Sequence, residues 1–433
     1  MVRAAVLAIG LVWCGAAHAQ TTETATTTEV RPDPPARVDL GRVILDAPAG
    51  FLEVAFVPLY VTVYALDRYS LFERILDVFT NEEQTMAYLP IVIPLGRSGP
   101  GFGGLFAYNA PLGSPNRLIV LGIANVNGDW TASVDGGLRL PFASGRAASL
   151  SVGASVDRDQ RFFGIGTETR NATEFLLRQN SIDVEASLTL LSPSVPVLTA
   201  EASLAYRRRR IESGEGTGSP IFDEDAPVRG PPGFNQGLDY PELGIQLGVD
   251  TRDSFGLTSR GFVLQNRARL TQDLNPGSGT GGATLTSEFG LWLPLLPRNR
   301  TLFFRGGIGS SIPFRNRDDI PFHFLQSLGG ASRLRGYPDN RFVDELAWWS
   351  SLEYRWFFYE WAGTGGGLVS TLFFDVGQTG PDLEDLFRTS AGNFPWSVGL
   401  ALRVEQSLIM LGRLQVGVSP EGVQISFGIG DVL

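Results

Sequence analysis

The sequence predicts an all-β fold, a transmembrane antiparallel β-barrel of about 16 strands, and three observations support this prediction. Segments of about ten residues with alternating apolar and polar side chains recur from residue 101 to residue 430. No run after the first 19 residues reaches the ~18 apolar residues that a membrane helix needs. Glycine and aromatic residues are abundant while only 18% of the residues are charged, which is typical of a chain rich in β structure.

The first 19 residues predict a secretory signal peptide. An apolar run ends in Ala17-His18-Ala19, the small-x-small pattern of a cleavage site. Cleavage would also remove Cys14, the single cysteine, so the mature chain is expected to have no disulfide and no cysteine-based site. An exported chain without a second membrane helix is periplasmic, secreted or an outer-membrane barrel.

Three regions follow the signal peptide. Residues 20–38 are rich in Thr, Glu and Pro, which predicts a disordered leader. Residues 39–95 are expected to form a short, partly helical N-terminal periplasmic extension, because Leu71, Leu76 and Phe79 recur at helical spacing. Residues 96–433 are expected to form the barrel.

Alternation within the barrel region is clearest in the segment 242–250. Leu243, Ile245 and Leu247 point to one side there, and Gly244 and Gln246 point to the other. A soluble β-sandwich would alternate in the same way, so the polar side decides between the two folds. Across the segments this side carries Asp, Glu, Arg and Gln beside many glycines, as the lumen of a barrel does.

Aromatic residues near segment ends also favour the barrel, because lipid-facing girdles are aromatic. The residues expected in such girdles are Trp292, Trp348, Trp356, Tyr206 and Tyr354.

The segments can be counted against a stretch at residues 324–344 that is not itself strand-like. Ten segments precede it, at 101–109, 116–126, 130–140, 148–157, 181–191, 197–208, 242–250, 261–270, 283–293 and 301–309. Five follow it, at 346–356, 367–375, 395–404, 411–419 and 423–430. Bacterial barrels close with an even number of strands, so residues 86–94 are the candidate for the missing one.

The length and polarity of the links between segments predict how the barrel is oriented in the membrane. Long polar links at 158–180 and 211–239 are expected outside the cell, and tight links at 141–146 and 420–422 are expected in the periplasm.

Residues 324–344, FLQSLGGASRLRGYPDNRFVD, are rich in glycine and arginine. Leu328-Gly329-Gly330 is followed by Leu334-Arg335-Gly336-Tyr337, and a glycine beside the arginine lets the backbone turn sharply without a Cβ clash. Residue for residue, this stretch resembles the lumen-inserted loop of the BamA/TamA-type outer-membrane barrel superfamily, also called the bacterial surface antigen family. We refer to residues 324–344 as the inserted loop.

Further motifs carry the same resemblance. Val249-Asp250-Thr251-Arg252-Asp253, followed by Ser259-Arg260-Gly261, is similar to a charged turn of the family, although local Asp–Arg pairs in a solvated turn would give the same sequence. Phe373-Phe374-Asp375-Val376-Gly377 is similar to its aromatic-x-Asp-x-Gly motif. Arg161-Phe162-Phe163-Gly164-Ile165-Gly166 looks like an aromatic-glycine motif of shorter members.

The resemblance implies sixteen strands and an inserted loop held in the lumen by Arg335. Alternation directs Asp375 and Glu353 inward, so both carboxylates are expected to meet this arginine. The residues expected to take part in this loop lock are Gly329, Gly330, Leu334, Arg335, Gly336, Tyr337, Glu353, Asp375 and Gly377.

The resemblance also implies a function at the outer membrane of a Gram-negative bacterium. Relatives insert or translocate proteins, and in some cases lipids, and this chain looks like a short member without clear POTRA domains. The expected partners are outer-membrane lipid and lipopolysaccharide, with an unfolded protein client or a periplasmic partner as a further candidate. A net charge of −10 speaks against nucleic acid.

Two other functions remain open at this stage, a passive outer-membrane pore and a barrel-embedded lipase. The lipase would need a serine and a histidine close together, and His323 is the single histidine after the signal peptide. We therefore expect no enzyme activity, no catalytic residue, no cofactor and no metal site, and a structural role for His323.

Overall fold

The structure is a computed structural model that describes residues 78–79, 81, 85–93, 99–109, 117–139, 146–166, 175–191, 197–213, 237–253, 258–275, 278–295, 299–315, 320–360, 366–388, 394–406 and 409–428. The expected signal peptide (1–19), the expected leader (20–38) and most of the expected extension (39–95) lie outside these residues.

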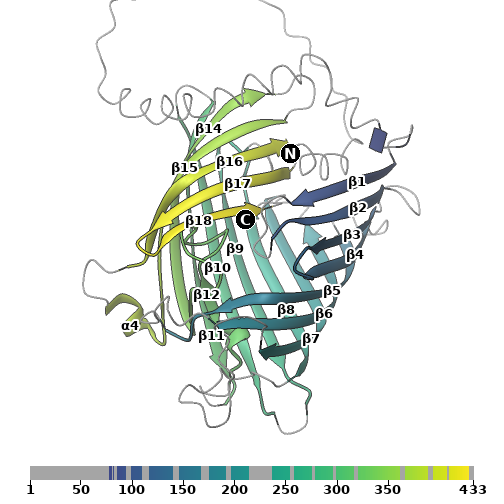
Figure 1. The fold of residues 1–433 in the computed structure, drawn as a ribbon, viewed down its shortest axis with the longest axis vertical. Coiled ribbons are helices and arrows are strands. Elements are labelled where there is room, and N and C mark those ends of the chain that lie inside the picture. Colours follow the sequence, from purple (N-terminus) through teal and green to yellow (C-terminus); the bar gives the residue numbers. More distant parts are fainter. Residues whose placement is uncertain are drawn as a thin grey trace, which may run out of the picture.

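Sixteen strands form a single antiparallel sheet in which the order in space follows the order in the chain (Figure 1). They are β1 (Met86–Ile93), β2 (Gly101–Asn109), β3 (Arg117–Asn125), β4 (Trp130–Arg139), β5 (Arg146–Phe162), β6 (Phe175–Leu191), β7 (Leu198–Ser213), β8 (Leu238–Asp250), β9 (Gly261–Gln272), β10 (Gly281–Leu295), β11 (Arg300–Pro313), β14 (Leu346–Glu360), β15 (Gly366–Gly380), β16 (Trp396–Gln406), β17 (Ile409–Ser419) and β18 (Gly422–Gly428). The fifteen segments expected around the inserted loop are all present among them.

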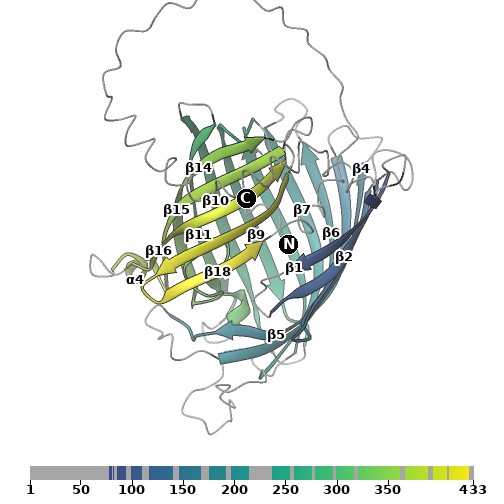
Figure 2. The same ribbon diagram turned by 45° about the horizontal axis from the view of Figure 1, so that its top comes forward.

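The sheet begins with the candidate strand at residues 86–94, which is present as β1 and lies before the expected domain boundary at residue 96. Pro90 is tolerated in β1 because this strand lies at an edge of the sheet, where a missing N–H need not break a ladder. The other edge is β18. No ladder joins β1 to β18 in the part of the chain that the structure describes, so the sheet curls but stays open at this seam (Figure 2).

The two faces of the sheet differ as the alternation predicts. In β8, Leu243, Ile245 and Leu247 are 50 to 55% exposed on the outward face. Glu242 and Gly244 beside them are buried on the concave face. In β8, apolar side chains therefore face outward and polar side chains face the lumen, the reverse of a soluble protein.

One expected girdle residue points the other way. Trp292 in β10 is 2% exposed and stacks on Phe303 with ring centroids 4.3 Å apart, whereas Tyr206 in β7 is 41% exposed on the outward face. The period of two explains this, because Trp292 lies on the same side of β10 as Glu288, which lines the lumen. The expectation of a lipid-facing Trp292 is wrong.

Strands β5, β6 and β7 have 17, 17 and 16 residues and continue well past the ends that alternation predicts. In an antiparallel sheet of this order, alternate links lie at the same end. The links β5–β6, β7–β8, β11–β14, β15–β16 and β17–β18 therefore share one end, which we call the loop rim. Residues 420–422 belong to this rim and not to the opposite one, so the expectation for this hairpin is wrong.

The β11–β14 link contains η4 (Phe322–Phe324) and a two-stranded sheet of β12 (Gln326–Leu328) and β13 (Phe342–Asp344). The buried side chains of Leu328, Leu334, Tyr337 and Phe342 form a small core with β14, so the inserted loop is a compact element rather than an irregular link. The β15–β16 link carries α4 (Leu383–Arg388), at lower left in Figure 1. No helix in the described part of the chain is long and apolar enough to cross a membrane.

Candidate functional site

The turn that presents Arg335 has an unusual backbone. Leu334 has a φ of 52°, a left-handed conformation that costs a side-chain-bearing residue roughly 1–3 kcal/mol. Its side chain is 1% exposed in the core of the inserted loop, and this packing holds the conformation. Tyr337 donates its backbone N–H to the Leu334 carbonyl at 3.0 Å, and Gly330, with a φ of 83°, donates to the Tyr337 carbonyl at 2.9 Å. The result is a closed turn that fixes the direction of Arg335.

Arg335 reaches both carboxylates expected for the loop lock. Its Nε and Nη2 donate to the two oxygens of Asp375 at 2.9 and 2.6 Å, and its Nη1 donates to Glu353 Oε1 at 2.7 Å. Nη2 also donates to Ser351 Oγ at 2.8 Å, and the backbone N–H of Arg335 donates to Asp375 Oδ2 at 3.0 Å. The guanidinium carbon lies 3.6 Å from the ring centroid of Phe373. Strands β14 and β15 thus provide hydrogen-bond acceptors for the edges of the Arg335 guanidinium and an aromatic ring for one of its faces.

Glycine allows the loop to approach the wall this closely. A Cβ at Gly336 would lie 2.7 Å from the Cβ of Ser397 in β16. The Gly336 carbonyl accepts a bond from Ser419 Oγ at 2.8 Å. Gly377 in β15 has a similar role, because its Cβ would lie 2.8 Å from the Trp348 carbonyl. Gly329, with a φ of 114°, approaches the backbone of the returning half of the loop.

Glu353 is shared by four arginines, which the sequence analysis did not foresee. Besides Arg335, the charged groups around it are Arg355 at 2.8 Å, Arg403 at 3.6 Å and Arg305 at 3.8 Å, and Arg403 also pairs with Glu405 at 2.6 Å. Asp375 differs, because Arg335 is its one ion-pair partner among the described residues, supported by Ser397 Oγ at 3.2 Å. Removing Arg335 would therefore leave Asp375 without an ion-pair partner among the described residues, whereas Glu353 would keep three arginines.

A second ion pair holds the inserted loop at the loop rim. Arg341 donates to the two oxygens of Glu421, in the β17–β18 hairpin, at 2.7 and 2.6 Å. The Arg341 guanidinium lies 5.2 Å from the ring centroid of Phe163, just beyond β5. Gly166 N–H donates to the Val343 carbonyl at 2.8 Å. The loop therefore contacts both the last hairpin and the end of β5.

The other family-like motifs have clear positions. Phe162 of the aromatic-glycine motif packs on Phe322 with ring centroids 4.9 Å apart, so this motif lies against the inserted loop. Arg252 of the charged turn donates to Asp250 at 2.7 Å and lies 5.6 Å from the ring centroid of Trp292. The plain interpretation of this turn as local Asp–Arg pairs agrees with these contacts.

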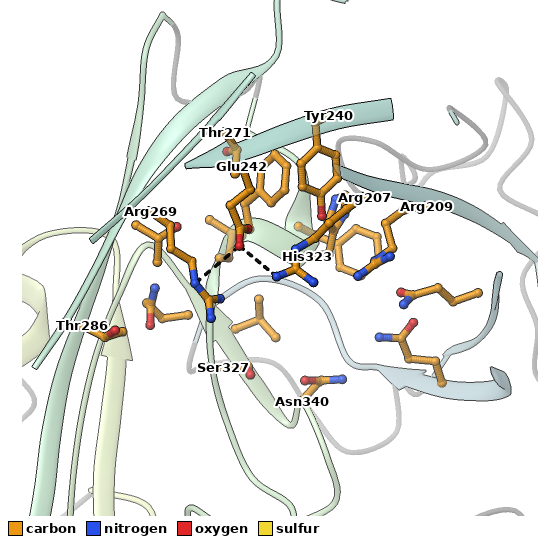
Figure 3. Close-up of a pocket in the computed structure, with 18 of the residues that line it drawn as sticks. Arg207, Arg209, Tyr240, Glu242, Arg269, Thr271, Thr286, His323, Ser327 and Asn340 are labelled. Atoms are coloured by element: carbon orange, nitrogen blue, oxygen red, sulfur yellow. Dashed lines mark hydrogen bonds and ion pairs between the residues drawn. The ribbon is translucent and has the colours of Figure 1, made fainter. Parts of the chain in front are cut away.

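A polar cavity of about 560 Å³, the lumen cavity, lies between the inserted loop and strands β5 to β10 (Figure 3). Arg207 in its wall donates to Glu242, Glu185 and Asp183 at 2.9, 2.9 and 3.0 Å. Arg269 approaches Glu242 at 3.6 Å from the neighbouring strand. This second charge network is separate from the loop lock.

His323 lies in η4 at the edge of the lumen cavity. Burial, and next the charge of Arg209, lower its pKa to about 3, so the ring is neutral at pH 7. Both ring nitrogens are buried without a hydrogen-bond partner among the described residues, and the ring packs on Phe324 with ring centroids 4.6 Å apart. No group of three or more His, Cys, Asp or Glu in the described chain could hold a metal ion.

The residues that the sequence analysis missed differ in how well they could have been found. Arg355 lies two residues after Glu353, so alternation alone puts both on the lumen face. Arg403 and Glu405 form a similar pair in β16. Glu421 carries no such pattern, because it lies in a turn, and its contact with Arg341 depends on how the loop folds.

Comparisons with known proteins agree with this geometry. The Omp85 superfamily domain matches residues 141–431. The fold is similar to the crystal structure of BamA from Haemophilus ducreyi lacking POTRA domains 1–3, with a TM-score of 0.54 and 14% identity over 80% of this chain and 70% of that chain. It is also similar to CdiB from Escherichia coli, with a TM-score of 0.52 and 12% identity over 79% of this chain, which spans 61% of the CdiB chain. No curated protein sequence matches the chain.

Proposed function

The chain belongs to the Omp85 superfamily, and on this premise we propose that it is an outer-membrane β-barrel protein that inserts or translocates proteins in a Gram-negative bacterium. The observation that carries the proposal is a loop held inside the curled sheet by a buried arginine, Arg335, between two wall carboxylates. A loop fixed in this way blocks the lumen at rest and can be displaced when a client engages. Outer-membrane lipid and lipopolysaccharide are its expected surroundings, and an unfolded protein is its expected client.

The outward face supports a membrane location. Exposed aliphatic residues follow one another along neighbouring strands, as Leu243 in β8, Leu270 in β9 and Leu285 in β10 do. The strand register places Leu243 directly opposite Leu270. Leu270 in turn faces Ala283, and Leu285 lies two residues further along the same face of β10. Such a band would be costly in water, whereas lipid removes the cost.

The location is tested by fractionation of cells that express the full chain. The protein is expected in the outer-membrane fraction and should migrate faster in electrophoresis before boiling than after it, because a barrel with paired strands resists detergent. Recovery from the soluble periplasmic fraction would contradict the proposal.

Closure of the sheet is part of the proposal, since open edges are not tolerated in lipid. We expect β1 and β18 to meet in the membrane. Cysteine pairs that combine Tyr88 or Val92 of β1 with Val423 or Ile425 of β18 test this, because all four side chains are exposed on the outward face. Oxidation should crosslink at least one pair in native membranes. If none of the four pairs crosslinks, the seam is not closed.

The role of the protein is tested by conductance and by client insertion. Proteoliposomes that contain the protein should accelerate the folding of an unfolded outer-membrane protein over protein-free liposomes. In planar bilayers the same preparation should show low conductance interrupted by brief openings. Steady high conductance without any acceleration of folding would instead favour the passive pore. Ester hydrolysis by the purified protein that is lost in His323→Ala would instead favour the barrel-embedded lipase.

A further inference from the structure

The lumen cavity contains two neighbouring arginines that acidic side chains neutralise less fully than its other arginines. Arg267 and Arg269 lie two residues apart in β9, so both side chains point to the lumen. Arg267 donates to the amide oxygen of Gln246, with Nε at 2.8 Å, and no carboxylate of the described residues lies within ion-pair distance of it. Arg269 approaches Glu242 at 3.6 Å, but this carboxylate already accepts a shorter bond from Arg207 at 2.9 Å (Figure 3).

The other arginines of the cavity are matched by acids. Arg209 pairs with Asp183 at 2.6 Å, and Arg333 pairs with Glu288. The cavity as a whole is lined by five arginines and two glutamates, a formal excess of three positive charges. Asp183 and Glu185 lie beside the cavity and offset the charges of Arg207 and Arg209. With these two acids counted, five arginines face four carboxylates, and the one remaining positive charge belongs to the Arg267 and Arg269 pair.

Hydroxyl groups face these two arginines. Thr284 and Thr286 of β10 are the cross-strand partners of Arg269 and Arg267, and both line the cavity. Directly opposed side chains in an antiparallel pair have their Cβ atoms about 4.5–5.5 Å apart, so each threonine hydroxyl lies beside the base of an arginine side chain, while the two guanidinium groups reach Gln246 and Glu242 of β8. Two planar guanidinium groups with hydroxyls on the neighbouring strand offer donors to the oxygens of a tetrahedral anion.

We propose that the lumen cavity binds a small phosphate-bearing anion, held by Arg267 and Arg269 with the hydroxyls of Thr284 and Thr286. The cavity volume of about 560 Å³ is within the range of small-ligand sites and exceeds what one phosphate group fills, so the bound molecule has room for further polar groups. Such groups would meet the amides of Gln160, Gln179 and Asn340, which also line the cavity. This site is independent of any role in protein insertion.

Calorimetric titration of the purified full chain in detergent with inorganic phosphate tests the proposal. We expect saturable binding that weakens at least tenfold when Arg267→Gln and Arg269→Gln are combined. Arg208→Gln is the matched control, since Arg208 lies in β7 on the outward face and is 44% exposed; phosphate binding should be unchanged. Heat-modifiable migration of each variant shows that it has folded.

A second titration identifies the source of the phosphate group. Micelles doped with a short-chain phosphatidic acid are used in place of inorganic phosphate, at the same salt concentration. Binding of either probe that is lost in the double variant supports the site, and the stronger probe shows whether a free anion or a lipid headgroup is the ligand. Absence of saturable binding of both probes, or equal binding by the double variant, would overturn the proposal. Displacement of phosphate by an equal concentration of chloride would overturn it as well, because it would mean simple counter-ion attraction.

Discussion

Two arginine–carboxylate networks line the same lumen, and they differ in how much water reaches them. In the loop lock, Arg335, Glu353 and Asp375 have side chains that are 1 to 2% exposed. In the lumen cavity, Asp183 and Glu185 are 31% and 34% exposed although they bond Arg207 at similar distances. The ion-pair distances are similar in the two networks, so the networks differ in how deeply their charged side chains are buried.

The inserted loop causes this difference. Its apolar core of Leu328, Leu334, Tyr337 and Phe342 packs against β14 and excludes water from the lock. The corresponding cluster beside the lumen cavity, in which Phe322 of the loop packs with Phe162, Leu177 and Ile211, leaves the side chain of Arg207 16% exposed. Ion pairs near water contribute about 0–1 kcal/mol, whereas breaking a buried pair by removing one partner costs about 3–5 kcal/mol. The same residue types therefore hold a loop in one place and form an open polar wall in the other.

The largest expected effect follows from Arg335→Ala. Asp375 loses its one counter-charge while Glu353 keeps Arg355, so we expect a cost near the lower end of the range, about 3 kcal/mol of loop docking. The population of the released loop should rise roughly 100-fold. Single-channel recordings should show more frequent openings, and trypsin should cleave at Arg341 in intact membranes.

Asp375→Asn tests whether this effect passes through the expected contact. Alone it should release the loop less than Arg335→Ala, and the double variant should add much less than the sum, because the two residues belong to one network. Full additivity would mean that Arg335 and Asp375 act separately, in conflict with their bidentate contact.

An intermediate effect is expected at the second ion pair of the loop. Arg341→Glu and Glu421→Arg should each weaken loop docking by about 1–3 kcal/mol, because each places two like charges together at a partly buried site. The exchanged double variant restores opposite charges and should recover most of the protease resistance. No recovery would show that the aromatic contacts of Arg341 with Phe163 and Phe342, rather than Glu421, hold this end of the loop.

The next effect depends on pH. His323 has a pKa of about 3 when the loop is docked and about 6.5 when it is free, so the released state takes up the proton first. Docking is unaffected above pH 6.5, and it should weaken by at most about 1.4 kcal/mol per pH unit as the pH falls from there toward 3. Protease sensitivity should therefore rise at pH 5 in the native protein and less in His323→Gln. Equal pH profiles would show that other groups cause the change.

The smallest effect is expected in the lumen cavity. Arg207→Gln breaks two ion pairs that remain close to water and one with the buried Glu242, which keeps Arg269 at 3.6 Å, so loop docking should change by no more than about 1 kcal/mol. A loss as large as that of Arg335→Ala would mean that the cavity is drier than its exposed carboxylates indicate, and the comparison of the two networks would fail.

Much of the fold could be predicted because strand alternation is local. The period of two located the fifteen strands around the inserted loop, although β5, β6 and β7 continue past the predicted ends, and the need for an even number of strands indicated β1. The resemblance to BamA/TamA-type barrels rested on motifs such as Leu334-Arg335-Gly336-Tyr337, and the Omp85 match confirms it. Two expectations failed because they were based on aromatic content and link length rather than on alternation and strand order. Trp292 faces the lumen, and residues 420–422 lie at the loop rim.

The sequence by itself determined which residues could meet, since alternation assigns Arg335's partners Glu353 and Asp375 to the lumen face. Tertiary structure decided which of the polar residues on that face contact one another and how completely water is excluded from the contact. Register places Asp375 opposite both Ser351 and Ser397, and the folded loop then brings Arg335 onto this row. Apart from the contact of Glu353 with Arg355 in the same strand, no local pattern encodes the arginines around Glu353 or the pairing of Arg341 with Glu421, because those contacts join segments far apart in the chain. The core of the inserted loop buries the network of Arg335, Glu353 and Asp375, which therefore holds the loop. The network of Arg207 stays partly exposed and lines the lumen cavity, and this difference in burial is a property of the whole fold.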